Sequence, residues 1–159
     1  MDYIHVVGGE ANKIDVNTAT SEDFKEVAQQ FGQAAVRARL AGYDCVQIHA
    51  GHGYLISQSN STALNKRTDE FRALDFKLLR MVNEEVRKCG IPAGIKLNSD
   101  DFIEGETMNA KQAAVIVKAL EFDFVEITGG GQTKASKYGT IRQGKDTYYY
   151  RHVVEELKS

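Results

Sequence analysis

The stretch SEDFKEVAQQFGQAAVRARLAGYDCVQIH, Ser21–His49, decides the fold because it joins two kinds of secondary structure. Two early acids precede apolar residues at helical spacing: Phe24, Val27, Ala28, Phe31, Ala34, Ala35 and Leu40. Gly42 ends this predicted helix, since glycine readily takes the left-handed conformation that follows a last helical turn. The short, mostly apolar run YDCVQIH then predicts a strand that is covered on both faces.

The same order of helix and strand recurs twice further along the chain. After a loop from Gly51 to Glu70, ALDFKLLRMVNEEVRKCG predicts a helix that ends at Gly90, and IPAGIKLN predicts a strand. NAKQAAVIVKALE, Asn109–Glu121, predicts a helix that runs into the strand FDFVEITGGG, and a last helix is predicted over Asp146–Leu157. Alternating helices and buried strands imply parallel strands joined by right-handed crossovers, so the fold class is α/β.

Length, composition and charge fit one globular domain. The chain has 159 residues, of which 42% are hydrophobic and 26% charged. Its formal net charge of −2 gives no basic field for a phosphate backbone, so we expect no nucleic-acid partner. The apolar runs are far shorter than the roughly 18 residues of a membrane span, and the first residues lack a signal-peptide pattern. We therefore expect no membrane partner, a cytoplasmic location, an irregular leader over residues 1–20 and one domain over residues 21–159.

The sequence holds two cysteines, Cys45 and Cys89. Two cysteines are too few for a disulfide framework, and their spacing does not match a zinc site. We expect both to be reduced, buried thiols.

Polar and small residues follow the predicted strands at the points where they end. In folds with parallel strands, ligand sites lie at the carboxyl ends of the strands. Here those ends carry His49–Tyr54, Lys96–Asp101 and Thr128–Gln132. We therefore expect the polar chemistry of the chain to collect at this one rim of the sheet.

The segment IHAGHGYLISQ, Ile48–Gln58, holds two of the four histidines of the chain. Gly51 and Gly53 allow a tight turn that brings the rings of His49 and His52 to one side. As neutral hydrogen-bond donors the rings would suit an oxygen that gains negative charge during a reaction, and Tyr54 beside them could supply a proton. Two alternatives are local capping of backbone groups and a metal site, although the segment offers no third donor in a recognised motif.

Lys96 lies inside the apolar strand IPAGIKLN. A buried ammonium group is costly unless it meets an anion or a polar cofactor, and a lysine that reaches out to the rim is the alternative. The run Gly129–Gly131 could let a backbone approach a ligand closely, but without a dinucleotide-binding register it also fits an ordinary loop.

IHAGHGYLISQ, NKRTDEF, GIKLNSDDFIEG and VEITGG, in this order, resemble the central part of the old yellow enzyme family of flavin-dependent NAD(P)H oxidoreductases. The resemblance covers about Asp23–Gly130 and is strongest to the NADH:flavin oxidoreductase branch, which carries two histidines in this turn. It implies a TIM barrel with FMN at its carboxyl-terminal mouth and NAD(P)H as reductant. It also implies small-molecule substrates with activated alkenes, such as α,β-unsaturated carbonyl compounds.

The resemblance implies roles for individual residues. His49 and His52 match the pair that hydrogen-bonds the carbonyl or phenolate oxygen of a ligand lying over the flavin. Tyr54 matches the tyrosine that protonates the substrate α-carbon. Lys96 matches the basic residue that faces the N1 and O2 edge of the flavin, where a cation stabilises the anionic reduced form.

The sequence also departs from the family pattern. A complete barrel needs about 250 residues in roughly eight strand-helix units, whereas we predict about three parallel strands, which the resemblance implies are the family strands four to six. Where the family has phenylalanine, leucine, serine and proline, this chain has Ser59, Asn60, Ser61 and Thr62. The prediction is therefore a partial TIM barrel whose sheet has open edges.

Two functions follow from these observations. The first is an FMN-dependent NAD(P)H oxidoreductase that retains half of the active-site mouth. The second is a non-catalytic barrel remnant that folds through its open sheet edges, by pairing with another copy or with a partner. A third hypothesis is a metal hydrolase site built on His49 and His52.

Overall fold

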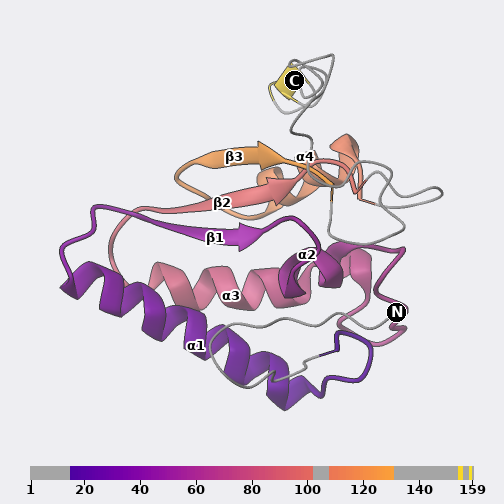
Figure 1. The fold of residues 1–159 in the computed structure, drawn as a ribbon, viewed down its shortest axis with the longest axis horizontal. Helices are drawn as coiled ribbons and strands as arrows, with labels where there is room; N and C mark the ends of the chain where they lie inside the picture. Colours follow the sequence, from indigo (N-terminus) through magenta and orange to yellow (C-terminus); the bar gives the residue numbers. More distant parts are fainter. Residues whose placement is uncertain (1–14, 102–107, 131–153, 156–157, 159) are drawn as a thin grey trace.

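The computed structural model describes residues 15–101, 108–130, 154–155 and 158. Within these residues, helices and strands alternate along the chain (Figure 1). The helices and strands are, in order, α1 (Ser21–Leu40), β1 (Val46–Ala50), α2 (Leu55–Asn60), the 3₁₀ turn η1 (Ala73–Asp75), α3 (Lys77–Arg87), β2 (Ala93–Asn98), α4 (Ala110–Ala119) and β3 (Val125–Thr128).

The described strands form one parallel sheet in the order β1-β2-β3. The helix α3 joins β1 to β2, and α4 joins β2 to β3, so each connection is a helical crossover. In the register of the sheet His49 pairs with Lys96, and Lys96 pairs with Glu126. The prediction of three parallel strands alternating with helices is therefore confirmed.

The helix α1 begins and ends where the sequence predicts. Thr20 caps it in a reciprocal capping box with Asp23, and this bond to Thr20 lowers the pKa of the Asp23 carboxyl. Gly42, with φ of +88°, follows the end of the helix. Along its length α1 packs against α3, and Gly32 allows the close approach, because a Cβ there would lie 3.0 Å from the Glu85 carbonyl oxygen.

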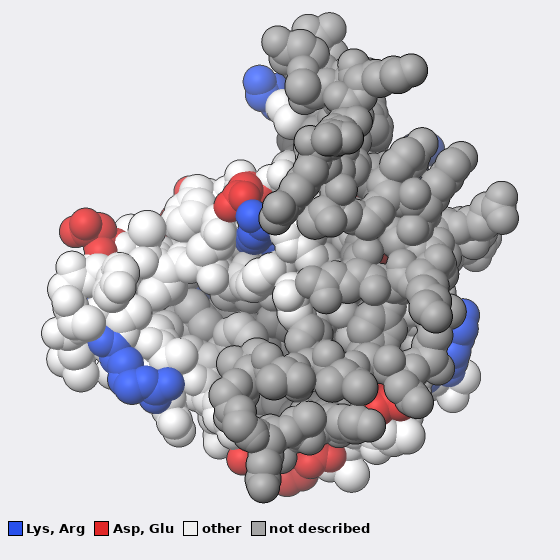
Figure 2. All heavy atoms as spheres, viewed as in Figure 1, with Lys and Arg blue, Asp and Glu red and all other residues white. Residues whose placement is uncertain are grey.

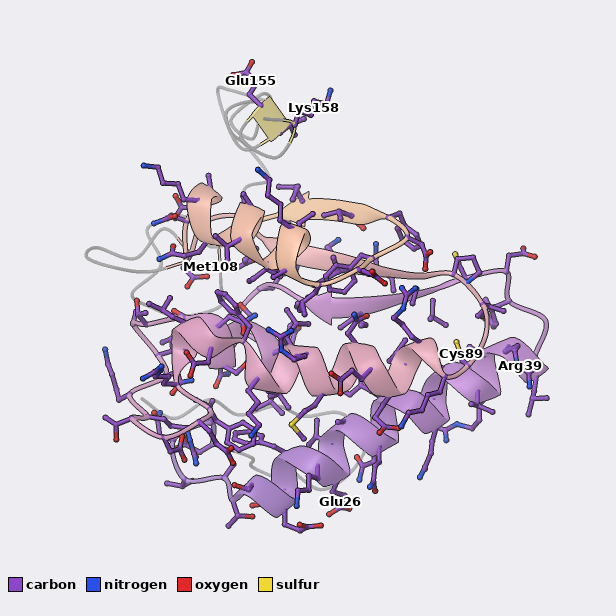
Figure 3. The ribbon with its side chains drawn as sticks, turned by 180° about the vertical axis from the view of Figure 1, so that it is seen from behind. Glu26, Arg39, Cys89, Met108, Glu155 and Lys158 are labelled. Carbon is purple, nitrogen blue, oxygen red and sulfur yellow. The ribbon has the colours of Figure 1, made fainter. Side chains whose placement is uncertain are left out.

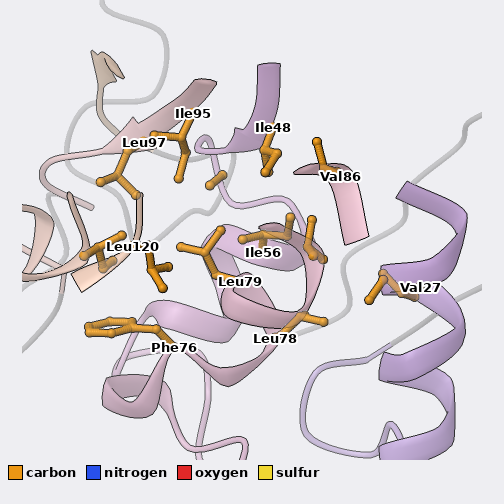
Figure 4. Packing of buried hydrophobic residues seen from close by; sticks show 14 of the residues in the cluster. Val27, Ile48, Ile56, Phe76, Leu78, Leu79, Val86, Ile95, Leu97 and Leu120 are labelled. Atoms are coloured by element: carbon orange, nitrogen blue, oxygen red, sulfur yellow. The ribbon is translucent and has the colours of Figure 1, made fainter. Parts of the chain in front are cut away.

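The hydrophobic core lies between the sheet and the helices α1 and α3. Ile48, Ile95 and Leu97 point from the sheet into this core, where Ile56 and Leu79 meet them from the helical side (Figure 4). Each of these five side chains is at most 2% exposed. Burying an aliphatic side chain of this size contributes about 1.5–3 kcal/mol, so this face holds the sheet to its helices.

The opposite face of the sheet carries the polar side chains. Gln47 and His49 of β1 and Glu126 of β3 are exposed, and Lys96 of β2 is half-buried. The prediction that YDCVQIH forms a strand covered on both faces is therefore wrong, because β1 alternates between buried and exposed residues. A closed barrel would enclose this face, whereas the three described strands leave it open.

The region Gly51–Glu70, predicted as a loop, contains the helix α2. Its sequence LISQSN is short and largely polar, so it has no apolar periodicity, yet most of its residues are buried. Helices this short are not stable alone and depend on tertiary packing. The predicted helix over 73–90 is also modified, because Phe76, with φ of +51°, separates η1 from α3.

The motif NKRTDEF ties the segment before α1 to the rest of the chain. The Arg67 guanidinium donates to the backbone oxygens of Val16 and Ala19, at 3.2 and 2.6 Å. It lies 5.4 Å from the ring centroid of Phe24 and also forms an ion pair with Asp69. The bonds to Arg67 lower the pKa of the Asp69 carboxyl. This motif therefore has a structural role in the chain.

The two cysteines differ in environment. Cys89 follows α3 and is buried, as predicted (Figure 3). Cys45 is exposed, so the prediction of a buried thiol is wrong there. The strand begins only at Val46, and Cys45 belongs to the exposed turn that leads into it.

Three remaining features are the predicted last helix, the distribution of surface charge and the length of apolar helices. The predicted helix over Asp146–Leu157 lies largely outside the described residues. On the face shown in Figure 2, the charged side chains of the described residues lie in small groups of either sign. No helix in the described part of the chain is long and apolar enough to cross a bilayer.

Candidate functional site

A sharp turn after β1 brings the two histidines and the tyrosine together. His52 and Gly53 have φ of +60° and +79°, so the chain turns sharply before Tyr54, which is the N-cap residue of α2. The ring centroid of His49 lies 5.1 Å from that of His52 and 5.0 Å from that of Tyr54, both in edge-on arrangements. Strand, turn and short helix together place three aromatic rings at the rim of the sheet.

The ring of His49 has a defined proton position. Its Nδ1 accepts a hydrogen bond from the Gly51 backbone N–H at 3.1 Å. In the neutral ring the proton therefore lies on Nε2, which is left as a donor. Although the residue as a whole is exposed, partial burial of its ring lowers the pKa of His49, and the nearby His52 and Lys96 lower it further. His49 is thus a neutral imidazole at pH 7.

The ring of His52 meets the end of the third described strand. Its Nε2 lies 2.6 Å from the hydroxyl oxygen of Thr128. Burial lowers the pKa of His52, and the positive charge of Lys96 adds to this, while Glu126 opposes it. His52 is therefore also neutral at pH 7, so neither ring adds positive charge to the site.

Lys96 occupies the next position in the same row of the sheet. Its Nζ lies 2.6 Å from Oε1 of Glu126, which is the anion that a lysine inside this strand needs. The bond from Lys96 lowers the pKa of the Glu126 carboxyl, with a further contribution from a hydrogen bond with Gln47. The sequence reasoning missed Glu126. The signal was the alternation in FVEIT, which places Glu126 on the same face as Thr128.

Behind the rim lies a buried polar cluster. Asn98 and Asp101 are almost fully buried, and the Asn98 Nδ2 donates to Asp101 Oδ1 at 2.9 Å. Burial raises the pKa of Asp101, although hydrogen bonds with Ser61 and Asn98 oppose the shift. The sequence places Asp101 only at the end of a predicted strand, in Lys96–Asp101, and the structure shows that it belongs to a buried hydrogen-bonded cluster.

The site suits an anionic or polar ligand. Lys96 lies close enough to both histidines to lower their pKa. Among the described residues, no group of three or more histidine, cysteine, aspartate or glutamate side chains could hold a metal ion. Neutral imidazole donors, a phenol and an ammonium group at one rim can stabilise an oxygen that gains negative charge and can deliver a proton beside it.

The fold and the rim define the class of protein. Parallel strands joined by helices, with polar side chains at the carboxyl ends of the strands, are features of the (β/α)-barrel proteins. A family model described as the NADH:flavin oxidoreductase / NADH oxidase family matches residues 8–158, and the chain belongs to this family. Members of the family use FMN with NAD(P)H as reductant.

Curated relatives come from fungi and bacteria. The NADH-dependent flavin oxidoreductase nadA of Aspergillus parasiticus is 38% identical over 147 residues, which are 87% of this chain and 31% of that protein. An NADPH dehydrogenase of Bacillus cytotoxicus is 30% identical over 154 residues, which are 92% of this chain and 44% of that protein. The chain thus spans less than half the length of these relatives.

Solved structures show the same fold. The old yellow enzyme homologue of Zymomonas mobilis matches with a TM-score of 0.64 at 24% identity, over 87% of this chain and 41% of that one. Morphinone reductase in complex with tetrahydroNAD matches with a TM-score of 0.60 at 23% identity, over 69% of this chain and 33% of that one. The described sheet and helices therefore correspond to part of the TIM barrel of these proteins and form a partial barrel.

Proposed function

We propose that this chain forms half of the active-site mouth of an FMN-dependent NAD(P)H oxidoreductase that reduces activated alkenes, such as α,β-unsaturated carbonyl compounds. The observation that carries the proposal is the cluster of His49, His52 and Tyr54, with Lys96 paired to His49 in the register of the sheet. Family membership supports the reaction class.

The chain's own residues fit the pyrimidine edge of a flavin. Lys96 is a cation on the open face of the sheet, next to the neutral histidines, and would face N1 and O2 of FMN. Glu126 balances this charge, so the row carries no net charge while the ammonium group of Lys96 remains a hydrogen-bond donor. FMN, when bound, supplies hydride equivalents that NAD(P)H renews.

The rim residues then act on the substrate. The Nε2–H of His49 donates to the carbonyl oxygen of an alkene substrate, or to a phenolate oxygen in an inhibitor, and His52 assists from the other side of the turn. Withdrawing charge toward that oxygen makes the β-carbon more electrophilic. Tyr54, whose ring lies edge-on against the ring of His49, provides the proton for the α-carbon.

Flavin binding tests this function directly. The purified chain should carry FMN or take up added FMN, with the visible absorbance of bound flavin and quenched flavin fluorescence. Addition of NAD(P)H should bleach the flavin, and an α,β-unsaturated ketone should restore the colour. A folded, colourless protein that takes up no added FMN would refute the enzymatic function.

A second candidate function is a non-catalytic barrel segment that folds by self-association. A groove of about 380 Å³ between α1 and β1 favours it, lined largely by apolar side chains that include Phe31, Val46 and Val86. Leu40 and Tyr43, at the same end of α1, are 73% and 66% exposed. Light scattering separates the candidates, since a stable monomer that binds FMN contradicts this one and an FMN-free oligomer supports it.

A further inference from the structure

Asn98 and Thr128 lie side by side at the carboxyl ends of two neighbouring strands. They are register partners, Asn98 as the last residue of β2 and Thr128 as the last residue of β3. Both side chains reach toward the turn that follows β1, although that turn is distant in sequence. Each contacts a different part of His52.

Asn98 holds the backbone of His52. Its Oδ1 accepts a hydrogen bond from the His52 N–H at 3.0 Å. Its Nδ2 donates to Asp101 Oδ1 and to the Gly130 carbonyl oxygen, each at 2.9 Å, so the orientation of the amide is fixed. His52 has φ of +60°, which is unfavourable for a residue with a side chain. The hydrogen bond that the His52 N–H donates to Asn98 therefore stabilises this strained backbone conformation.

Thr128 holds the ring of His52, and Gly51 leaves room for both contacts. The Thr128 hydroxyl lies 2.6 Å from Nε2, which restricts rotation of the imidazole. A Cβ at Gly51 would lie 2.8 Å from the Thr128 methyl carbon and 3.0 Å from Asn98 Oδ1. A side chain at this position would push the turn away from both partners.

We propose that Asn98 and Thr128 are positioning residues for His52, the first through its backbone and the second through its ring. Their importance for substrate binding rests on the proposed function, but the positioning itself is a property of the chain without flavin. Neither residue touches the substrate in this proposal. They fix where the second imidazole of the rim lies and which nitrogen it presents.

Nuclear magnetic resonance of the flavin-free protein tests the ring contact. Thr128→Val keeps the shape of the side chain and removes the hydroxyl. We expect the ring ¹⁵N shifts of His52 to change, because Nε2 loses its hydroxyl partner, while the ring of His49, whose Nδ1 accepts from the Gly51 N–H, keeps its shifts. Unchanged His52 ring shifts in this variant would overturn the role of Thr128.

Amide hydrogen exchange tests the backbone contact. In Asn98→Ala, the His52 amide should exchange at least about tenfold faster relative to the amides of α1 and α3. Asn83→Ala is the matched control, because Asn83 is also a buried asparagine but bonds to the Glu121 carbonyl oxygen, away from the turn. If the control accelerates His52 exchange equally, Asn98 has only a general structural role.

A second variant tests the role of Asn98 if the first does not fold, and FMN binding separates the positioning of His52 from the proposed function. If Asn98→Ala does not fold, the double variant Asn98→Asp, Asp101→Asn keeps an acceptor for the His52 N–H and reverses the bond between residues 98 and 101, so that amide should stay protected. A loss of protection in this double variant, with α1 and α3 intact, would contradict the proposal. A chain that shows the expected His52 changes but binds no FMN supports the positioning and refutes the proposed function, so the two failures are distinguishable.

Discussion

Lys96 Nζ lies 2.6 Å from Glu126 Oε1, across the register pair that joins β2 to β3. This ion pair lies close to the two histidines of the rim, and its charges shift the pKa of both. Lys96 lowers the pKa of His49 and of His52, whereas Glu126 raises both. Together with burial, the balance keeps the imidazoles neutral near pH 7, the state in which each ring has one N–H donor and one acceptor nitrogen.

Replacing either member of the ion pair should shift the histidines in opposite directions. Lys96→Met removes the positive charge, so the pKa of both histidines should rise. Glu126→Gln should lower both pKa values further. Titration of the histidine ring resonances measures the shifts, with Lys25→Met on α1 as a control that leaves them unchanged. Shifts of the same sign in both variants would contradict this electrostatic account.

The lowered pKa of the histidines makes stability depend on pH. An unfolded histidine has a pKa of 6.5, and folding lowers it for His49 and His52. Their contribution to the free energy of unfolding is therefore fully present above the unfolded pKa. It is lost as the pH falls from the unfolded pKa through the lower folded pKa, because the unfolded state binds more protons in that range. Urea unfolding at about pH 7.5 and about pH 5.5 measures the loss.

The double variant His49→Gln, His52→Gln provides the comparison for this pH dependence. The loss of stability between the two pH values should be smaller in the variant than in the original chain. Carboxyl groups such as Asp101 are common to both proteins, so their contribution cancels in the difference. An equal loss in both proteins would show that the histidines do not couple folding to protons.

Asn60 should be a weak point of the fold. It is 2% exposed, and its Nδ2 has no hydrogen-bond partner among the described residues. A buried donor without a partner costs about 1–3 kcal/mol, so Asn60→Leu should raise the free energy of unfolding by a similar amount. Thermal or urea unfolding measures the change.

Asn65→Leu is the matched control for Asn60→Leu. The Nδ2 of Asn65 donates to the carbonyl oxygens of Ser59 and Phe71, at 2.7 and 2.8 Å, and its Oδ1 accepts from the Arg67 N–H. The same substitution at this residue should therefore lower stability. If Asn60→Leu is as destabilising as Asn65→Leu, the Asn60 side chain stabilises the fold even though its Nδ2 has no hydrogen-bond partner among the described residues, and the prediction is wrong.

Arg67 should contribute more to stability than an exposed arginine. Its guanidinium bonds two backbone oxygens and lies over the rings of both Phe24 and Phe71, so Arg67→Met should cost about 2–5 kcal/mol. Arg72→Met removes only an exposed ion pair with Asp75 and should cost at most about 1 kcal/mol. Equal losses in urea unfolding would show that the NKRTDEF motif does not tie the segment before α1 to the fold.

The regular parts of the fold were predictable from local sequence. Apolar periodicity and Gly42 define α1, and β-branched runs define the strands, because these features depend on neighbouring residues. The position of the rim was predictable from the alternation of helices and strands along the chain, since the carboxyl ends of parallel strands lie at one edge of the sheet. The helix α2 was not, because LISQSN is polar and is held in place by packing across the chain. Glu126 was missed because its importance depends on the register that places it beside Lys96.

The residues at the rim also differ in how well sequence could predict their chemistry. The closeness of His49, His52 and Tyr54 follows from local spacing and two glycines. The proton position of His49 depends on a contact with Gly51 N–H, and the ring of His52 depends on Thr128, which is 76 residues away. A sequence pattern indicates which groups gather, whereas the tautomer of each ring requires the three-dimensional contacts.

Tyr54 offers the sharpest test of the chemistry, because its proposed role concerns only one half of the reaction. Tyr54→Phe keeps the ring that packs edge-on against His49, 5.0 Å between centroids, and removes the proton donor. Reduction of bound FMN by NAD(P)H should keep its rate. Reoxidation by an α,β-unsaturated ketone should slow by about 10²–10⁴-fold, the usual contribution of a general acid. Stopped-flow absorbance of the flavin follows the two halves separately.

Tyr43→Phe, on the exposed turn before β1, is the control for Tyr54→Phe and should change neither rate. Equal slowing of both halves in Tyr54→Phe would mean that the phenol supports flavin binding, and an unchanged second half would mean that the proton comes from elsewhere.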